Sequence, residues 1–322
     1  MEVYLGIDGG GTQTRSLLVN ADGEILGRGR SGPTNVQHRT ESELAETLKE
    51  VSAQAFAGTG TKIELMAACY GLAGSSTKTA QRTVSAMVGT ITPKPAYGFS
   101  LQTDAQVALT GAFTRNPGAL LILGTGSVCL ATDETGKIHQ TGGWGSIIDD
   151  AGSSGWIGKR AIETAVRQAD GRIEGNALQE AIFNALGIDS VDAIVPLLHG
   201  GDIEWKTIAA LCPIVMNLAE GGDATANHIL ESALNEIVAM VRASQRKSGA
   251  TSLKLAITGG LSDSNSFFYK HLHALLIKTV EGVQPQRPKL PAVAGAVLEA
   301  YRHHHNHIPA SFIENLRASL NS

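Results

Sequence analysis

The stretch from Val3 to Val19 limits what this chain can fold into more than any other. It begins as a short apolar run, passes through Asp8 into three consecutive glycines, and resumes as the apolar run that ends at Val19. This pattern predicts a strand, a tight turn and a second strand, which together form a β-hairpin with a glycine tip. At such a tip the backbone is bare, so successive N–H groups can close on an anion such as a phosphate. An ordinary hairpin with a glycine bulge explains this stretch alone equally well.

The residues around this tip suggest how a phosphate and a metal ion would be held. Gly10 and Gly11 would offer backbone N–H groups, and Thr12 and Thr14 would add hydroxyl donors. Asp8 stands at the end of the first strand, where a carboxylate can hold water on a divalent cation.

Composition sets the wider limits. With 322 residues and 43% hydrophobic content, the chain can bury a large core, and its length favours two domains. A net charge of −4 gives no support for nucleic-acid or membrane binding as the main function. No signal segment or long apolar span is apparent, which predicts a cytoplasmic protein. Cys69, Cys129 and Cys212 are widely spaced and form no CxxC pair, so we expect reduced, mostly buried thiols without zinc or disulfides.

The next hundred residues predict a mixed sheet with helices on its faces. Residues 24–30 are expected to form a third strand, and Thr40 with Glu43 forms a capping box that starts an amphipathic helix reaching about residue 57. Further strands are predicted at 63–70 and 97–103, the second of them followed by a helix over 105–113. Three hairpin strands followed by strand–helix units are typical of such a mixed sheet.

The opening pattern returns in the middle of the chain. A buried strand at 119–123 leads into Gly124-Thr125-Gly126-Ser127 and then into two further strands, which repeats the architecture with little sequence identity. Two such units predict two similar halves that face each other across a cleft, with the boundary at 116–118. Residues 152–247 are helical in pattern, with breaks at 187, 200–201 and 221–222. A last strand at 253–258 ends in Gly259 and Gly260.

With these motifs the chain resembles the sugar kinase/actin/Hsp70 nucleotide-binding superfamily, and within it the BadF-type ATPase and N-acetylglucosamine kinase family. The resemblance covers nearly the whole length. Residues 8–14 and 124–127 are similar to the family's two phosphate loops, Thr258-Gly259-Gly260-Leu261 to its adenosine motif, and residues 291–296 to its small-residue connecting helix. Gly142-Gly143-Trp144-Gly145, followed by Asp149-Asp150-Ala151-Gly152-Ser153, resembles the sugar-binding segment of N-acetylhexosamine kinases.

The resemblance implies a fold, ligands and site residues. The fold would be α/β, with two ribonuclease H-like (actin-like ATPase) domains, each a mixed five-stranded sheet flanked by helices, and a cleft between them. Residues 1–117, completed by a C-terminal helix at about 291–322, would form one domain and residues 118–290 the other. The implied cofactors are ATP and Mg²⁺, the implied substrate is a small amino sugar, and the implied assembly is a homodimer. The ATP-binding residues would be Asp8, which would also hold the metal through water, together with Gly10, Gly11, Thr12, Thr14, Gly124, Thr125, Gly126, Gly259 and Gly260. The sugar-binding residues would be Thr34, Asn35, Asp104, Ser127, Gly143, Trp144, Gly145 and Asp150.

Asp104 is the candidate catalytic residue. Phosphoryl transfer needs donors for the phosphates, a metal ion to bridge them, and a base for the acceptor's proton. Asp104 leaves a strand end, where its carboxylate could meet a sugar hydroxyl. The family places its general base in a Thr-Asp-Ala run, which here is Thr103-Asp104-Ala105. The alternative is that Asp104 only caps the helix that begins at Ala105.

Other site candidates also have structural alternatives. Asp150 could be a solvated turn acid, Asn35 a turn residue, and Trp144 a core anchor. Gly259 and Gly260 could simply start a helix, and for Cys212 we expect a packing role.

Several motifs are excluded or discounted. Lys159 lacks the upstream glycine of a Walker A loop, and no GxGxxG follows a strand, which argues against a dinucleotide site. No HExxH or GxSxG element is present in the sequence. The histidines in residues 303–307 are expected to be a solvated helix end rather than a metal site.

Two classes of function follow. In the first, ATP·Mg²⁺ phosphorylates the C6 hydroxyl of N-acetylglucosamine or a related hexosamine, with glucosamine and N-acetylmuramic acid as alternatives. In the second, the chain is a BadF-type ATPase that activates a partner enzyme, whose relatives hold an iron–sulfur cluster between two subunits through cysteines. The cysteine spacing and the segment from Trp144 to Asp150 favour the kinase, and an actin-like filament former is a distant third. Mammalian-type N-acetylglucosamine kinases carry Asn directly after the Gly-Thr-Gly-Ser tip, where this chain has Val128, so part of the sugar contact differs. The extra acid Asp149 could favour a positively charged, unacetylated amino group over an acetamide.

Overall fold

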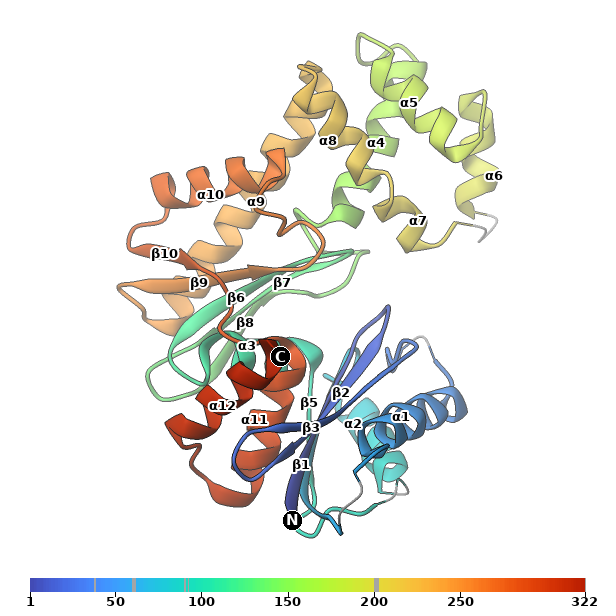
Figure 1. Ribbon diagram of the computed structural model, residues 1–322. Helices are drawn as coiled ribbons and strands as arrows, with labels where there is room; N and C mark the ends of the chain where they lie inside the picture. Colours follow the sequence, from blue (N-terminus) through green and yellow to red (C-terminus); the bar gives the residue numbers. More distant parts are fainter. Residues whose placement is uncertain (38, 60–61, 90, 92, 200–202, 322) are drawn as a thin grey trace. The chain divides into compact units, whose positions relative to one another are not determined.

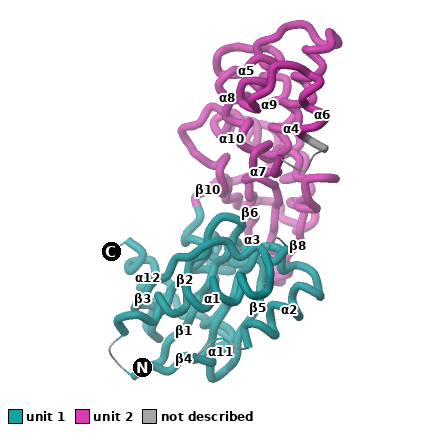
Figure 2. Tube along the Cα trace, turned by 90° about the vertical axis from the view of Figure 1, so that its right-hand side faces the viewer, with its two compact units in different colours: residues 1–116, 288–322 teal, residues 117–287 magenta. Residues whose placement is uncertain are grey.

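The computed structural model divides the chain into two compact units (Figures 1 and 2). It describes residues 1–37, 39–59, 62–89, 91, 93–199 and 203–321. The first unit comprises Met1–Asn116 and Pro288–Ser322, and the second comprises Pro117–Arg287. No helix in the described ranges is long and apolar enough to cross a membrane. The predicted helix break at 200–201 lies outside the described residues.

The first unit is built on a five-stranded sheet in the order β3-β2-β1-β4-β5. Its β1, β2 and β3 form an antiparallel meander, whereas β4 and β5 run parallel to β1. The strands span β1 Glu2–Gly9, β2 Thr14–Asn20, β3 Ile25–Ser31, β4 Glu64–Leu72 and β5 Phe99–Gln102.

Helices cover both faces of this sheet (Figure 1). On β1, Tyr4 packs into a core with α11 and α12, while Leu5 and Ile7 pack into a second core with α1 and α2. This alternation is the period-two pattern of a strand buried on both sides. A Cβ at Gly6 would collide with the backbone of Val297, so α11 lies directly on the strand. The helices span α1 Glu41–Phe56, α2 Lys78–Val88, α3 Asp104–Phe113, α11 Ala292–His305 and α12 Ala310–Asn321.

The second unit repeats the same topology in its own sheet, of order β10-β9-β6-β7-β8. Here β6, β7 and β8 form the meander, and β9 and β10 are the parallel strands. The strands span β6 Gly118–Leu123, β7 Ser127–Thr132, β8 Ile138–Gly142, β9 Leu253–Thr258 and β10 Val283–Gln286. The helices span α4 Ser154–Ala169, α5 Ala177–Leu186, η1 Val191–Ala193, α6 Ile194–His199, α7 Trp205–Ala209, α8 Cys212–Glu220, α9 Ala224–Ser248 and α10 Phe267–Thr279. The prediction of two mixed five-stranded α/β sheets flanked by helices is confirmed.

Local signals in the sequence also match the structure. Thr40 and Glu43 form the predicted capping box at the start of α1. The three cysteines are reduced and buried, and burial raises the pKa of each thiol, to about 12 for Cys69 and Cys212 and to about 11 for Cys129.

The histidines at the end of α11 form a solvated helix end, as expected: His303, His305 and His307 are exposed, and His304 is half-buried. His304 and His305 both contact the Tyr4 hydroxyl, at 2.9 Å and 2.7 Å, and their rings pack against aromatic neighbours. This contact was not predictable from the sequence because it joins positions 300 residues apart. No group of three or more metal-ligating side chains is found among the described residues.

Candidate functional site

The first unit gathers the candidate acids at one edge of its sheet. Asp8 pairs across the sheet with Gly71, and Gly71 pairs with Gln102. The parallel strands β1, β4 and β5 therefore end side by side, and Asp104 follows two residues after Gln102, the last residue of β5. In open α/β sheets this carboxyl edge is where ligands bind. Asp8 and Asp104 are close enough for the charge of Asp104 to raise the pKa of Asp8.

Asp104 does not cap its helix, so the alternative interpretation of this residue is wrong. Helix α3 is capped by Thr103, whose hydroxyl accepts from the Gln106 N–H at 3.2 Å, and the Gln106 side chain accepts from the Thr103 N–H at 2.9 Å. Asp104 is instead the first helical residue, and its carboxylate has no side-chain partner within the described ranges. Burial raises the pKa of Asp104, and the backbone N–H of Ala105 partly offsets this.

Asp8 is a partly buried carboxylate whose proton affinity is high. Burial first, and then the negative charge of Asp104, raise its pKa to about 7, although Arg15 acts to lower it. Arg15 pairs with Asp8 in the hairpin register. We did not single out Arg15 from the sequence, although the tip length fixes a register that places it opposite Asp8. Two neighbouring acids with raised pKa values suit a divalent cation, which would favour their charged forms.

A backbone hydrogen bond within the first hairpin tip uses one of its N–H groups. The Gly10 N–H donates to the Gln13 carbonyl at 3.0 Å, so this N–H is already used. Gly11 and Thr12 are exposed at the tip, and no protein acceptor for their N–H groups is found in the described part of the chain. A Cβ at Gly11 would meet open space, so no packing within the described protein requires glycine there.

Thr14 and Thr34 brace this tip. Both side chains are fully buried, and their hydroxyls lie 2.9 Å apart. The Thr14 hydroxyl donates to the Gly32 carbonyl at 2.7 Å, which leaves Thr34 as the donor to Thr14. Both hydroxyl protons are therefore used inside the protein, and in this structure the two threonines hold the loop.

Asn35 is brought to the same edge by backbone hydrogen bonds. Thr34 N–H donates to the Gly10 carbonyl, and Val36 N–H to the Ala73 carbonyl. The Asn35 side-chain oxygen accepts from the Gln37 N–H at 3.0 Å, which is the turn role considered from the sequence. Its side-chain NH₂ has no partner within the described residues, so a donor remains for a ligand.

In the second unit, the tip at Gly124–Gly126 is held by the start of α4. Ser154 donates to the Gly124 carbonyl through both its N–H and its hydroxyl, each at 2.9 Å. The Thr125 carbonyl accepts from the Gly155 N–H and from the Trp205 indole N–H, each at 3.2 Å. The carbonyls thus point into the protein, while the N–H groups of Thr125 and Gly126 have no protein partner in the described ranges. We did not identify Ser154 as a brace, although Ser153-Ser154 ahead of a helix is a recognisable cap signal.

Asp150 clasps this second tip. It is buried, has a left-handed backbone with φ of 59°, and accepts from the Ser127 N–H at 3.3 Å. The Ser127 hydroxyl donates to the Ala151 carbonyl at 2.8 Å. A Cβ at Gly126 would press on the Asp150 carboxylate, which explains that glycine. Burial raises the pKa of Asp150, so the interpretation of Asp150 as a solvated turn acid is wrong.

Gly259 and Gly260 lie beside this tip. Strand β9 pairs with β6 through Ile122 and Thr258, and the Leu261 N–H donates to the Leu123 carbonyl at 3.1 Å. Gly259 has a φ of 101°, and a Cβ there would collide with Leu123. The structure thus brings two of the predicted ATP-binding segments together within the second unit.

Trp144 is not a core anchor, because 66% of its surface is exposed. It lies in a loop with Gly143 and Gly145, which have φ of 76° and 99°. The Asp149 carboxylate accepts from the Trp144 N–H at 3.2 Å, and the Asp149 N–H donates to the Gly145 carbonyl at 2.8 Å. Asp149 therefore shapes this loop, whatever further role it has.

Comparison with known proteins agrees with these features. Residues 5–300 match the family described as the BadF/BadG/BcrA/BcrD ATPase family. The chain is 28% identical over 307 residues to an N-acetylmuramic acid/N-acetylglucosamine kinase of Clostridium acetobutylicum, covering 93% of this chain and 98% of that protein. It is 27% identical over 315 residues to a glucosamine kinase of Vibrio cholerae, covering 95% and 98%.

A solved structure shares the fold. It is that of a Chromobacterium violaceum protein named as an N-acetylglucosamine kinase, with a TM-score of 0.72, 26% identity, and coverage of 92% of this chain and 98% of that one. The match over nearly the whole sequence and the shared fold lead to one conclusion: this chain belongs to the BadF/BadG/BcrA/BcrD ATPase family.

Proposed function

We propose that this protein is an ATP-dependent amino-sugar kinase that phosphorylates the C6 hydroxyl of N-acetylglucosamine or a related hexosamine. The observation that carries this proposal is Asp104, whose carboxylate lies at the carboxyl edge of the first sheet although Thr103, not Asp104, is the N-cap of α3. Burial raises the pKa of Asp104, which increases its affinity for the proton of a sugar hydroxyl.

The chain's own groups can be assigned to steps of the reaction. Asp104 accepts the proton of the sugar hydroxyl as its oxygen attacks the terminal phosphorus of ATP, and ADP leaves. The unpaired N–H groups of Gly11, Thr12, Thr125 and Gly126 donate to phosphate oxygens. Asp8 would hold a divalent metal ion through water, which would supply positive charge for the phosphates. Gly259 and Gly260 provide bare backbone for adenine.

The proposed sugar contacts come from groups that retain hydrogen-bonding capacity. The free NH₂ of Asn35 donates to a sugar hydroxyl, and the Asp150 carboxylate accepts from another. The exposed ring of Trp144 packs against the sugar, with the backbone of Gly143 and Gly145 beside it. Thr14, Thr34 and Ser127 act as braces that position these groups, because their hydroxyl protons are already used.

The names of the relatives support an amino sugar as the substrate, and they include acetylated and unacetylated hexosamines. Asp149 remains a candidate for this choice, because the Trp144 N–H contacts one of its two carboxylate oxygens. Turnover of glucosamine and of N-acetylglucosamine should be compared in wild type and Asp149→Asn. An unchanged preference would remove Asp149 from the selection of substrate.

The ATPase activator is the alternative. The three thiols are buried in the cores of the two units, which does not suit ligands for a cluster shared between subunits. A cytoplasmic homodimer remains part of the proposal, and light scattering in solution measures its assembly state.

A coupled assay of ADP release with ATP, Mg²⁺ and a panel of hexosamines tests the proposal. We expect ADP release that depends on an amino sugar. ADP release at the same rate without any sugar would overturn the kinase and favour the ATPase activator.

A further inference from the structure

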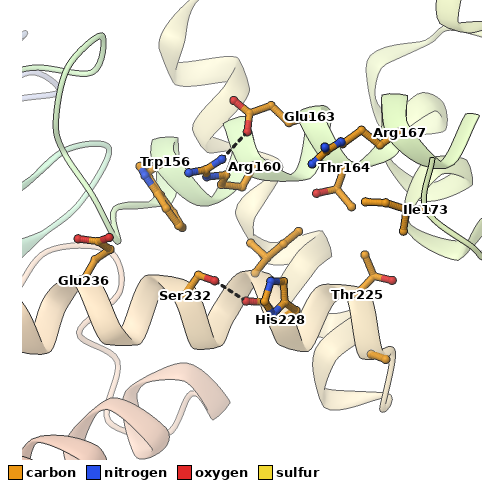
Figure 3. Close-up of a pocket in the computed structure, with 12 residues that line it drawn as sticks. Trp156, Arg160, Glu163, Thr164, Arg167, Ile173, Thr225, His228, Ser232 and Glu236 are labelled. Atoms are coloured by element: carbon orange, nitrogen blue, oxygen red, sulfur yellow. Dashed lines mark hydrogen bonds and ion pairs between the residues drawn. The ribbon is translucent and has the colours of Figure 1, made fainter. Parts of the chain in front are cut away.

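A groove lies in the second unit, between α4 and α9 (Figure 3). Its volume is about 620 Å³, which is in the range of small-molecule sites. None of the residues assigned above to ATP or to the sugar lines it. The groove is therefore distinct from the residues assigned to the proposed reaction.

The two ends of this groove differ in chemistry. Figure 3 shows Trp156 and Glu236 at one end, and Arg167 and Thr225 at the other. The Trp156 ring is partly exposed, and the Arg160 guanidinium lies over it at 5.0 Å from the ring centre. Because Arg160 covers part of the ring, a sugar would pack its C–H face on the part of the indole that stays exposed, and its hydroxyls would donate to Glu236 at the same end of the groove.

The charges along the groove favour an anion at the Arg167 end. Arg160 is already paired with Glu163 at 2.9 Å. Arg167 has no ion pair within the described residues, because nearby Asp170 is bound by Arg172 at 2.6 Å. A guanidinium without a partner is the side chain best suited to bind a phosphate through two hydrogen bonds.

The groove is linked to the second tip through the first turn of α4. The Trp156 N–H donates to the Ser153 hydroxyl at 3.1 Å, and the next residue, Ser154, holds the Gly124 carbonyl. A ligand that packs on Trp156 thus contacts the same helical turn that braces the proposed phosphate-binding loop.

We propose that the α4–α9 groove binds a phosphorylated sugar, with the sugar ring on Trp156 and the phosphate on Arg167. This proposal rests on the proposed function for its physiological ligand, since the product of a hexosamine kinase has this chemistry. Binding would lower the rate of phosphorylation by disturbing the start of α4, so the product would restrain its own formation.

Calorimetric titration with glucosamine 6-phosphate, glucosamine and inorganic phosphate tests the groove. The variants are Arg167→Gln and, as a matched control, Arg246→Gln, which removes an exposed arginine outside the groove. We expect Arg167→Gln to weaken sugar-phosphate binding by about tenfold or more, because a charged hydrogen bond is lost. Arg246→Gln should change it by less than about twofold.

A kinetic readout separates the groove from the reaction site. In wild type, glucosamine 6-phosphate should inhibit in a manner that added sugar does not relieve, and Arg167→Gln should remove this inhibition while leaving the initial rate unchanged. Equal binding by wild type and Arg167→Gln would overturn the proposal, as would inorganic phosphate binding as tightly as the sugar phosphate. Binding that depends on Arg167, in a protein that phosphorylates no sugar, would keep the groove and refute only the proposed kinase.

Discussion

The two hairpin tips share a backbone plan but are held by different chemistry. In each, the residue that opens the returning strand, Thr14 or Ser127, is buried and donates its hydroxyl to a backbone carbonyl. The first tip is completed by a neutral partner, Thr34, and the second by a carboxylate, Asp150. The acids of the first unit, Asp8 and Asp104, have no such bracing role.

This difference suggests a division of labour between the repeated units. The first unit keeps two acids without a bracing role at its sheet edge. Burial raises the pKa of both, and the charge of Asp104 raises that of Asp8 further. The second unit uses its acid as a clasp and leaves backbone donors at its tip. Under the proposed function, the first unit would supply the base and the metal carboxylate, and the tips of both units would supply backbone donors for the phosphates.

Asp104→Asn tests the role of the first unit and should have the largest effect. We expect the rate of sugar phosphorylation to fall by about 10²- to 10⁴-fold, because an amide cannot take the hydroxyl proton. ATP affinity, measured by calorimetry, should change little. Asp189→Asn, at an exposed position, is the control, and survival of activity in Asp104→Asn would show that the base is another group.

Glu299→Ala contrasts a paired acid of the first unit with the unpaired ones. Glu299 is 1% exposed and contacts Arg115 and Arg302, each at 2.8 Å, and Thr110 at 2.8 Å. Burial acts to raise the pKa of Glu299, but these partners hold it below its ordinary value. We expect a loss of about 3 kcal/mol in the free energy of unfolding, the lower end of the cost of breaking a buried ion pair. The loss is no larger because Arg115 and Arg302, left without Glu299, remain in contact with water. Urea denaturation measures it with Glu314→Ala as the exposed control, and a loss no larger than the control's would contradict it.

Thr14→Val and Ser127→Ala compare the two braces directly. Each removes a buried hydroxyl donor and leaves a carbonyl without it, which should cost about 1–3 kcal/mol in the free energy of unfolding. Thr14→Val should cost more, because Thr34 also loses its acceptor. Denaturation curves of the two variants give the difference, and a larger cost for Ser127→Ala would reverse this comparison.

Asp8→Asn should have the smallest effect on stability, and with the opposite sign. Because the pKa of Asp8 rises from its ordinary 3.8 to about 7, the folded chain binds the proton more tightly than the unfolded chain. The wild type therefore loses stability as pH rises through this range, and the variant does not. In the absence of metal, Asp8→Asn should unfold at a slightly higher temperature than wild type at pH 8, with a smaller gap at pH 4. A lower midpoint at pH 8 would show that Asp8 is a stabilising charge.

Local patterns in the sequence predicted the hairpin strands, the glycine tips and the capping box at Thr40, because these depend on neighbouring residues. The two five-stranded sheets were expected from the resemblance to the family, and the short edge strand β10 was not predicted. The side-chain bonds within the site were not predicted either. The pair of Thr14 with Thr34 and the clasp of Asp150 on Ser127 join positions about 20 residues apart, and only the folded backbone sets their distances. The role of Asp104 was ambiguous from the sequence because both Thr103 and Asp104 are common N-cap residues. The structure assigns the N-cap to Thr103.

Phosphorus NMR of a reaction with ATP, Mg²⁺ and an amino sugar, in wild type and in Asp104→Asn, is the most direct check on the proposed chemistry. In wild type we predict a phosphate monoester on C6 that forms only when the sugar is present, and in the variant its near disappearance with ATP still bound. Inorganic phosphate released without sugar, at the same rate in both proteins, would contradict it.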